Sequence, residues 1–253
     1  MSFPGRLPAT GRTRVTRHGG CPTNRFPDPH YQDSPVSDRA LPSVPCRQRL
    51  RIRFRKENDL RWIGHRDLAR AFERLVRRAR LALRMSEGYH PKPKINFPSA
   101  LALGIEGLDE VVELELAEPA DPPDVLRRLA LVAPAGLTVT SVRTIESGVP
   151  KPRVRAMHYR FPVPAARQPR VRQGAEDLLA QATLPFRREG RSQPVDLRAD
   201  LTSLEVRDGA LLFCIGASHH ASVRPGDVLT LLGLTDLQQQ GYFLTRTAVE
   251  LAS

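Results

Sequence analysis

A set of segments that recurs along the chain constrains its fold more than any other feature. Three segments of the first half resemble three of the second half in the same order: residues 79–88 with 182–190, 109–117 with 208–217, and 122–130 with 224–233. Asp124 and Asp227 are separated by the same number of residues as Ala79 and Ala182, with which the first pair of segments begins. Chance similarity would seldom give equal offsets, so the pattern predicts a duplicated folding unit.

Hydrophobic residues predict the order of elements within each copy. Leu50, Ile52 and Phe54 alternate with arginine, which is typical of a half-buried strand. The first copy is predicted to contain a strand at 49–56, a helix at 65–80, strands at 94–103 and 110–116, a helix at 121–132 and a strand at 137–145. The second copy is predicted to begin with a strand at 157–163 and a helix at 171–182, and to end with a strand at 242–251.

This order, β-α-β-β-α-β, is that of the ferredoxin-like split βαβ arrangement, in which two helices cover one face of an antiparallel sheet. We therefore predict an α+β fold of tandem duplicated ferredoxin-like (βαββαβ) units with antiparallel sheets, the first at residues 47–149 and the second at residues 150–253. Residues 1–46 are rich in Arg and Pro and have no helical or strand periodicity. They are predicted to form a disordered arm.

The chain is strongly basic, with a formal net charge of +12 and a pI of about 10.7. Most of this charge is arginine, whose planar guanidinium suits phosphate and carboxylate. A polyanionic partner follows as a hypothesis, with RNA first; the alternative is an Arg-rich composition that serves no function. No apolar run is long enough to span a membrane, and the N-terminus has no apolar signal-peptide core. We expect a cytoplasmic protein without membrane association.

The three cysteines, Cys21, Cys46 and Cys214, form no C-x-x-C pair and no disulfide framework. Iron–sulfur clusters are held by several thiolates, so we expect no cluster and no other cofactor on this chain. The adjacent His219 and His220 would point to opposite faces of a strand, which argues against a shared metal ion.

The first motif, LRWIGHRDL at residues 60–68, places His65 and Asp67 at the predicted start of a helix, with Arg61 just before it. Unpaired backbone N–H groups at a helix N-terminus favour anions, and a histidine there can transfer protons near neutral pH. The motif predicts a phosphate or carboxylate site, with His65 as the candidate catalytic residue. The alternative is an ordinary helix start in which Asp67 offsets the helix dipole.

The second motif, SEGYHPKPKINF at residues 86–97, combines an aromatic ring with cationic and polar side chains on a backbone stiffened by proline. Its candidate binding residues are Ser86, Tyr89, His90, Lys92 and Lys94. Aromatic and basic residues interleaved in this way suit single-stranded RNA. We expect this loop to fold back onto Arg61 and His65 to form one site; the alternative is a stiff connector whose Tyr89 packs on the core.

These two motifs resemble those of the radical SAM-linked family, a domain of unknown function numbered 2344, with roughly the pattern L-R-[FW]-[IL]-S-H-x-D-L followed by S-x-G-[FY]-[NH]-P-x-P-K-I-x-F. In the second half, PVDLRADL at 194–201 and the S-x-R-P stretch at 222–225 extend the similarity and add Asp196, Arg198 and Arg224 to the candidate binding residues. Asp196 and Arg198 are also able to pair with each other. Gly64 stands where the family commonly has Ser, which removes a possible helix cap.

The resemblance implies a partner, because family members are fused to, or encoded beside, radical SAM enzymes, often near genes for ribosomes and RNA processing. Three hypotheses follow. The first is a non-catalytic RNA- or substrate-binding accessory protein of a radical SAM enzyme, whose partner alone carries the iron–sulfur cluster and S-adenosylmethionine. The second is a metal-independent RNA-processing or RNA-modifying enzyme that uses His65. The third is a protein-interaction module without nucleic-acid binding.

Overall fold

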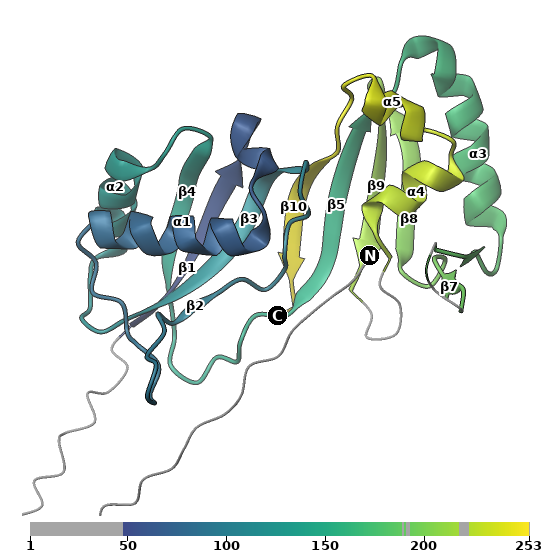
Figure 1. Ribbon diagram of the computed structural model, residues 1–253. Helices are drawn as coiled ribbons and strands as arrows, with labels where there is room; N and C mark the ends of the chain where they lie inside the picture. The colour runs from purple at the N-terminus through teal and green to yellow at the C-terminus, as the bar shows by residue number, and fades with distance from the viewer. Residues whose placement is uncertain (1–47, 189, 191–192, 218–222, 253) are drawn as a thin grey trace, which may run out of the picture. The chain divides into compact units, whose positions relative to one another are not determined.

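The computed structural model of the chain describes residues 48–188, 190, 193–217 and 223–252 (Figure 1). The predicted disordered arm at residues 1–46 and the pair His219 and His220 lie outside these residues. Contacts between Cα atoms group the chain from Val44 to Ser253 into one compact unit. The elements described below all belong to this unit.

The described residues form a mixed α+β structure. Its strands are β1 (Gln48–Lys56), β2 (Ile95–Asn96), β3 (Glu106–Leu116), β4 (Leu137–Ile145), β5 (Val154–Pro162), β6 (Pro185–Phe186), β7 (Val195–Asp196), β8 (Leu201–Arg207), β9 (Ala210–Gly216) and β10 (Thr245–Leu251). Its helices are α1 (His65–Arg78), α2 (Pro122–Val132), α3 (Gln168–Ala180), α4 (Pro225–Leu231) and α5 (Thr235–Gln239), with 3-10 turns η1 (Asn58–Trp62) and η2 (Ala165–Arg167) before α1 and α3.

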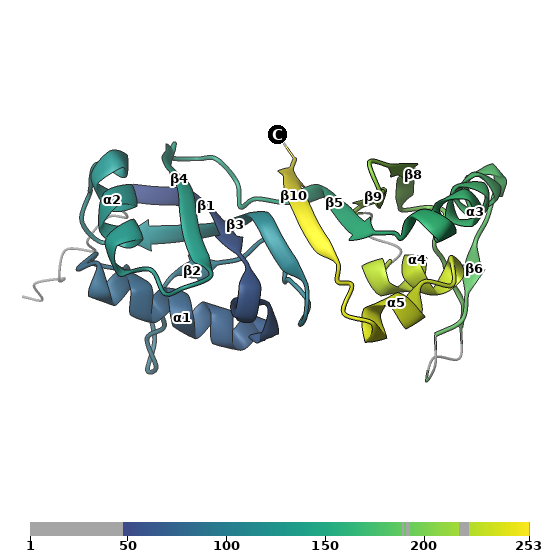
Figure 2. The same ribbon diagram turned by 90° about the horizontal axis from the view of Figure 1, so that it is seen from above.

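Eight of the described strands form one sheet in the order β4-β1-β3-β10-β5-β9-β8, with β2 paired to β3 beside this path. Neighbouring strands are antiparallel except β3 and β10, which are parallel and pair through Thr245 with Glu106 and Arg246 with Gly107. Figure 2 shows β10 between β3 and β5. The prediction of an α+β fold is confirmed, and the sheet is mostly antiparallel.

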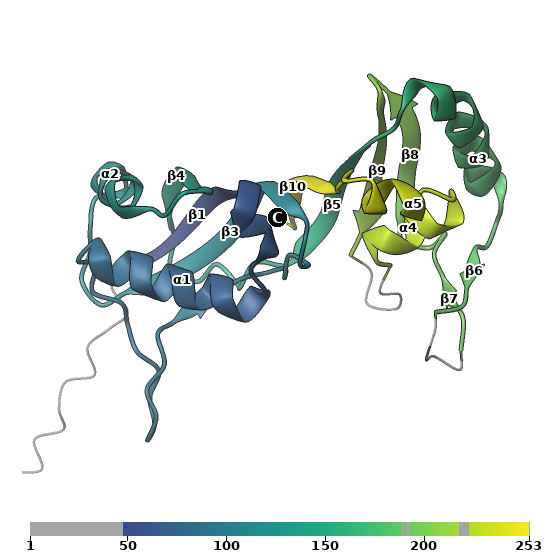
Figure 3. The ribbon, with the colours of Figure 1, turned by 45° about the horizontal axis from the view of Figure 1, so that its top comes forward.

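Strand β1 and helix α1 follow the predicted periodicities. The alternate apolar residues of β1 are buried, and α1 buries one face against them, with the rings of Phe54 and Phe72 4.7 Å apart in an edge-to-face contact. Helix α2 begins after Asp121, whose side chain accepts a hydrogen bond from the Asp124 N–H. Helices α1 and α2 form one layer on the sheet, where they pack against β1, β3 and β4 (Figure 3).

Two hydrophobic clusters fill the unit. One joins β1, β3 and β4 to α1 and α2, and the other joins β5, β8 and β9 to α3, α4 and α5. Leu101 and Ile105 precede β3 in the sequence but pack in the second cluster. Their burial draws residues 97–105 away from β3. Strand β2 is therefore limited to Ile95–Asn96, where the sequence predicted a strand through residue 103.

Strand β8 is the main element that hydrophobic periodicity missed, whereas β9 lies in residues 208–217, which the repeat matched to the segment with the predicted strand 110–116. Strands β8 and β9 form a hairpin. Its turn residues, Asp208 and Gly209, both have positive φ angles, 50° and 71°. Positive φ at both central positions is what a two-residue type I′ turn requires, and Asp-Gly is a preferred sequence for it. The dipeptide is therefore the sequence signal that locates β8. The last strand begins at Thr245 rather than at residue 242.

Candidate nucleic-acid interface

Three of the predicted site residues, Arg61, His65 and Arg224, line one groove of about 1120 Å³. Its walls come from η1 and the start of α1, from residues 100–105, and from the segments at 224–227 and 238–244. Trp62 and Phe243 add aromatic rings to the lining. Residues from the first and second halves of the chain therefore meet in this groove.

Arg61 is held between two aromatic rings. Its guanidinium carbon lies 5.0 Å from the ring centre of Trp62 and 4.7 Å from that of Phe243. The guanidinium also donates a 3.3 Å hydrogen bond to the Asn58 carbonyl, and Glu106 lies 3.9 Å from it. Cation–π contacts on two sides restrict the side chain, so its positive charge is presented at a defined place in the groove.

Lys56 fixes the backbone next to Arg61. Its buried ammonium donates hydrogen bonds to the carbonyl oxygens of Ile63 at 2.9 Å and Arg61 at 3.4 Å. Burial lowers the pKa of Lys56, and the nearby positive charge of Arg246 lowers it further, while the charge of Glu110 acts in the opposite sense. The chain between β1 and α1 is thus anchored by a group that water does not reach.

Trp62 and Leu103 leave apolar surface open at the groove, with exposed fractions of 58% and 62%. Gly104 supports Trp62 from one side. Its φ of 79° favours glycine, and a Cβ at this position would lie 3.2 Å from the indole ring. The Arg61 guanidinium also lies over this ring, and the rest of the indole surface is exposed. Trp62 belongs to the first motif, yet its sequence position alone did not identify it as a site residue.

His65 is the first residue of α1 and follows Gly64, which provides no side-chain cap. The imidazole is exposed, and its ring meets the Phe97 ring edge-on at 5.3 Å. Asp67 pairs with Arg70 at 3.6 Å. Within the described part of the chain, no carboxylate forms a hydrogen bond with His65. The imidazole is therefore placed to contact a ligand, but none of the described carboxylates orients it as a general base.

Arg224 enters the groove directly before α4. Its backbone N–H donates a 2.9 Å hydrogen bond to Asp227, and the Asp227 N–H donates to the Arg224 carbonyl at 3.0 Å. Asp227 is buried and receives the guanidinium of Arg188 at 2.6 Å. This buried ion pair fixes the backbone at Arg224, whose side chain is exposed.

The segment between α1 and β2 projects from the unit as a hairpin (Figure 1). Ser86 and Lys92 close it: the Ser86 N–H donates to the Lys92 carbonyl at 2.8 Å, and the Lys92 N–H donates to Ser86 Oγ at 2.9 Å. Tyr89 at the tip is 94% exposed, and its ring meets the His90 ring at 5.0 Å. Tyr89 therefore does not pack on the core.

This segment returns to the first motif at Phe97, whose ring contacts that of His65. The tip of the hairpin does not take part in this contact. Lys94 pairs with Glu115 of β3 at 3.5 Å, so the base of the hairpin is held at β3. Within the described residues, no hydrogen bond, ion pair or ring contact joins Tyr89, His90 or Lys92 to Arg61 or His65. The structure thus divides the residues that the sequence predicted as one site between a groove and a hairpin.

Asp196 and Arg198 hold the end of the β6–β7 hairpin. One oxygen of Asp196 accepts hydrogen bonds from the backbone N–H groups of Leu184 at 2.7 Å and Arg198 at 2.9 Å. The Arg198 guanidinium donates to the Leu201 carbonyl at 2.9 Å. The two residues are therefore linked through the Arg198 backbone, and their polar groups serve the local fold.

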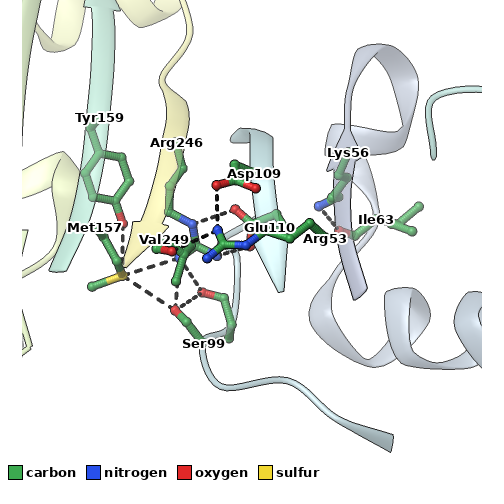
Figure 4. A network of polar contacts seen from close by, with 11 residues as sticks. Arg53, Lys56, Ile63, Ser99, Asp109, Glu110, Met157, Tyr159, Arg246 and Val249 are labelled. Atoms are coloured by element: carbon green, nitrogen blue, oxygen red, sulfur yellow. Dashed lines mark hydrogen bonds and ion pairs between the residues drawn. The ribbon is translucent and has the colours of Figure 1, made fainter. Parts of the chain in front are cut away.

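A buried polar network at the pairing of β3 with β10 was missed by sequence reasoning (Figure 4). Arg246 is 1% exposed and forms a two-point ion pair with Glu110, with 2.7 Å between Nε and Oε1. It also donates to Ser99 Oγ at 3.0 Å. Burial opposes the charge of Arg246, but the hydrogen bonds and charge of Glu110 raise its pKa above the usual value. No local pattern in the sequence distinguishes Arg246 from the arginines of β1, which alternate with apolar residues but are not buried.

The described residues contain neither a membrane-spanning helix nor a cluster of metal ligands. None of the helices there is both long and apolar enough to cross a membrane. No group of three or more His, Cys, Asp or Glu side chains in those residues is arranged to hold a metal ion.

Comparison with known proteins places the chain in a family. Residues 49–225 match DUF2344, described as an uncharacterized protein conserved in bacteria. No curated protein shows significant sequence similarity. A crystal structure of an unknown protein from Galdieria sulphuraria aligns over 81% of this chain and 99% of its own, at 14% identity. The TM-score of 0.24 is too low to indicate a shared fold. Because the match spans most of the chain, the protein belongs to the DUF2344 family.

Proposed function

We propose that this protein is a non-catalytic accessory protein that binds RNA, or another anionic substrate, for a radical SAM enzyme. The RNA-binding part of the proposal rests on the groove at Arg61, His65 and Arg224. The partnership with a radical SAM enzyme rests on the resemblance of the two motifs to the radical SAM-linked family. Co-purification of a radical SAM protein with the tagged chain from its native cells would support that partnership, and its consistent absence would count against it.

The observation that carries the RNA-binding proposal is the combination of fixed cations and an open aromatic surface in one groove. Single-stranded nucleic acids are bound by positive charges that follow the backbone and by aromatic rings on which bases stack. Arg61 and Arg224 supply charge from different halves of the chain, and Trp62 supplies an exposed indole in the same lining.

A second candidate function is RNA cleavage or modification by His65. The exposed imidazole in the groove favours this candidate, whereas the absence of an orienting hydrogen bond among the described residues favours binding alone. His65→Ala separates the two. An accessory protein loses modest affinity, whereas an enzyme keeps its affinity and loses its rate. The third candidate, a protein-interaction module, predicts no RNA affinity in the purified protein.

We also propose that the fold arose by duplication of a ferredoxin-like unit. Numbered within its own half, each set of four strands has the order 4-1-3-2: β4-β1-β3-β2 in the first half and β10-β5-β9-β8 in the second. This order, together with two helical segments per half, supports the proposal.

The groove is tested by titrating the protein into a fluorescent single-stranded RNA of about 12 nucleotides, within the usual site sizes, at several salt concentrations. Trp62→Ala should weaken binding by roughly 1–3 kcal/mol with little change in salt slope, because stacking releases no counterions. Arg224→Ala should reduce the slope of log affinity against log salt by about one unit, as expected for one lost phosphate contact.

Arg172→Ala is the matched control for charge, because Arg172 is an exposed arginine on α3 outside the groove lining. Tyr89→Ala compares the hairpin with the groove, because Tyr89 is an exposed aromatic residue outside the groove lining. If Arg172→Ala changes the slope as much as Arg224→Ala, binding is a property of the net charge. If Trp62→Ala binds like the parent, the groove is not the RNA site.

A further inference from the structure

A second cleft lies near the start of β1, whereas the groove lies beyond the last residue of that strand. The cleft encloses about 290 Å³, and its polar lining residues are Arg49, Lys94, Asn96, Glu113, Glu115 and Lys151. Arg49 alternates along β1 with Leu50, which packs in the core with α1 and α2, so Arg49 lies on the sheet face opposite these helices. Lys94 and Asn96 belong to the second motif, and neither lines the groove. Part of that motif therefore contributes to a separate cavity.

Arg49 is fixed in the cleft by neighbours on β3 and on the connection between β4 and β5. Its Nε lies 3.6 Å from a carboxylate oxygen of Glu113, and its Nη2 donates a 3.1 Å hydrogen bond to the Pro150 carbonyl. Glu113 is also paired with Arg51 at 2.8 Å. Within the described residues, neither Nε nor Nη1 of Arg49 makes a hydrogen bond, and of these two atoms only Nε is buried. Nη1 is therefore an accessible donor with no acceptor in the protein.

The cleft carries an excess of positive charge. Glu115 lies 3.4 Å from Arg84 and 3.5 Å from Lys94, so each of its two carboxylates already faces two cations. Lys151 is a fifth cation, and no hydrogen bond or ion pair of the described residues engages its ammonium.

Five cations around two carboxylates leave an excess of three positive charges. Four of the five side chains are only 11–31% exposed, so water screens their charges in part. An anion that enters the cleft is therefore stabilised by more than an exposed lysine would provide.

The donors in the cleft favour phosphate over carboxylate. A carboxylate is matched best by the planar fork of an arginine, whereas a lysine ammonium is a point charge that commonly binds phosphate. Lys94 and Lys151 supply two such charges beside the Arg49 guanidinium, and Asn96 adds an amide. A phosphate monoester carries a charge of about −1.5 to −2 near neutral pH, which balances most of the excess.

We propose that this cleft binds a phosphate group, supplied either as inorganic phosphate or as the terminal phosphate of a nucleotide. Arg49 and Lys151 donate to its oxygens from the two sides of the cleft formed by β1 and by the connection between β4 and β5. The inference does not rest on RNA binding in the groove, because the two cavities share no lining residue.

The experiment titrates the full chain, in a phosphate-free buffer, with sodium phosphate, adenosine 5′-monophosphate or adenosine, and follows backbone amide signals by NMR. Both phosphate compounds should shift the signals of residues 94–96 and of Lys151 until they saturate, and adenosine should not. Tighter binding of the monophosphate than of inorganic phosphate identifies a nucleotide as the source, and equal affinities identify the free anion. Lys151→Ala and Arg49→Gln should each weaken binding about tenfold, as expected for one lost hydrogen bond to a charged group.

Lys92→Ala is the matched control, because Lys92 is an exposed lysine of the second motif outside the cleft lining. Circular dichroism melting confirms that each variant is folded, and Lys151→Ala keeps the test valid if Arg49→Gln disturbs β1. Three results would overturn the proposal: no saturable shift with either phosphate compound, shifts at Trp62 and Gly104 of the groove in place of those at Lys151, or equal affinities of Lys151→Ala and Lys92→Ala.

Discussion

At the scale of single residues, Arg246 shows how this chain uses buried charge. Its guanidinium contacts Ser99 and Met157, and its charge is balanced by Glu110 from the other half of the chain. Taking two charges out of water is costly, and the remaining charge is destabilising when one partner is removed. The pair therefore favours the pairing of β3 with β10 over alternatives that would leave either charge alone.

We predict that Glu110→Gln lowers the free energy of unfolding by about 3–5 kcal/mol, because it leaves Arg246 buried with its charge unmatched. The double variant Glu110→Leu with Arg246→Met should lose less than the two single changes together. Asp109→Asn is the control: its pair with Arg53 at 2.5 Å is partly exposed and should contribute at most about 1 kcal/mol. Urea denaturation measures the parent and each of these variants, and equal losses for Asp109→Asn and Glu110→Gln would contradict the role of burial.

The candidate site was predictable from the sequence where its residues are close neighbours in the chain. Arg61 and His65 fall in one motif, and the helix start that follows Gly64 brings both to the groove. Phe243 was not predictable, because no local pattern distinguishes an aromatic residue that packs on a distant arginine from one that packs in the core. Arg224 was identified only through the family resemblance, since its approach to Arg61 depends on tertiary packing.

At the scale of elements, long strands and helices with clear periodicity were predictable, and short ones set by distant packing were not. Strand β1 and helix α1 lie close to their expected positions because their apolar residues repeat with the periods of a strand and a helix. Strand β2 has two residues, because Leu101 and Ile105 are drawn into the other core. No local sequence signal reports that competition.

The hairpin between α1 and β2 provides a test at this scale. Replacing residues 87–91 with Asn-Gly should preserve the backbone pairing of Ser86 with Lys92. Because Tyr89 makes no core contact, the free energy of unfolding should change by less than about 1 kcal/mol. If the groove binds RNA by itself, affinity should fall only slightly. A loss as large as that of Trp62→Ala, measured with the same RNA, would show that the hairpin belongs to the binding site.

At the scale of the whole molecule, the predicted boundary between residues 149 and 150 cuts through contacts that the described chain uses for stability. Leu101 and Ile105 fill the second core from the first half, Glu110 balances Arg246 across the boundary, and β3 pairs with β10. A ferredoxin-like strand order in each half favours independent folding, whereas these shared contacts favour folding as one unit. The two influences make opposite predictions for separated halves.

We predict that the shared contacts dominate. Fragment 150–253 alone should aggregate or remain unfolded, because its core lacks two apolar side chains and contains an unmatched Arg246, a deficit of several kcal/mol by order of magnitude. Co-expressed with fragment 47–149, it should form a soluble complex with the circular dichroism spectrum of the intact chain. Removal of residues 1–45 is the control truncation: that segment lacks apolar periodicity, so the melting temperature should change by no more than a few degrees, roughly 1 kcal/mol. A fragment 150–253 that melts cooperatively by itself would show that the second half is a complete domain, and that its contacts with Leu101 and Glu110 serve position rather than stability.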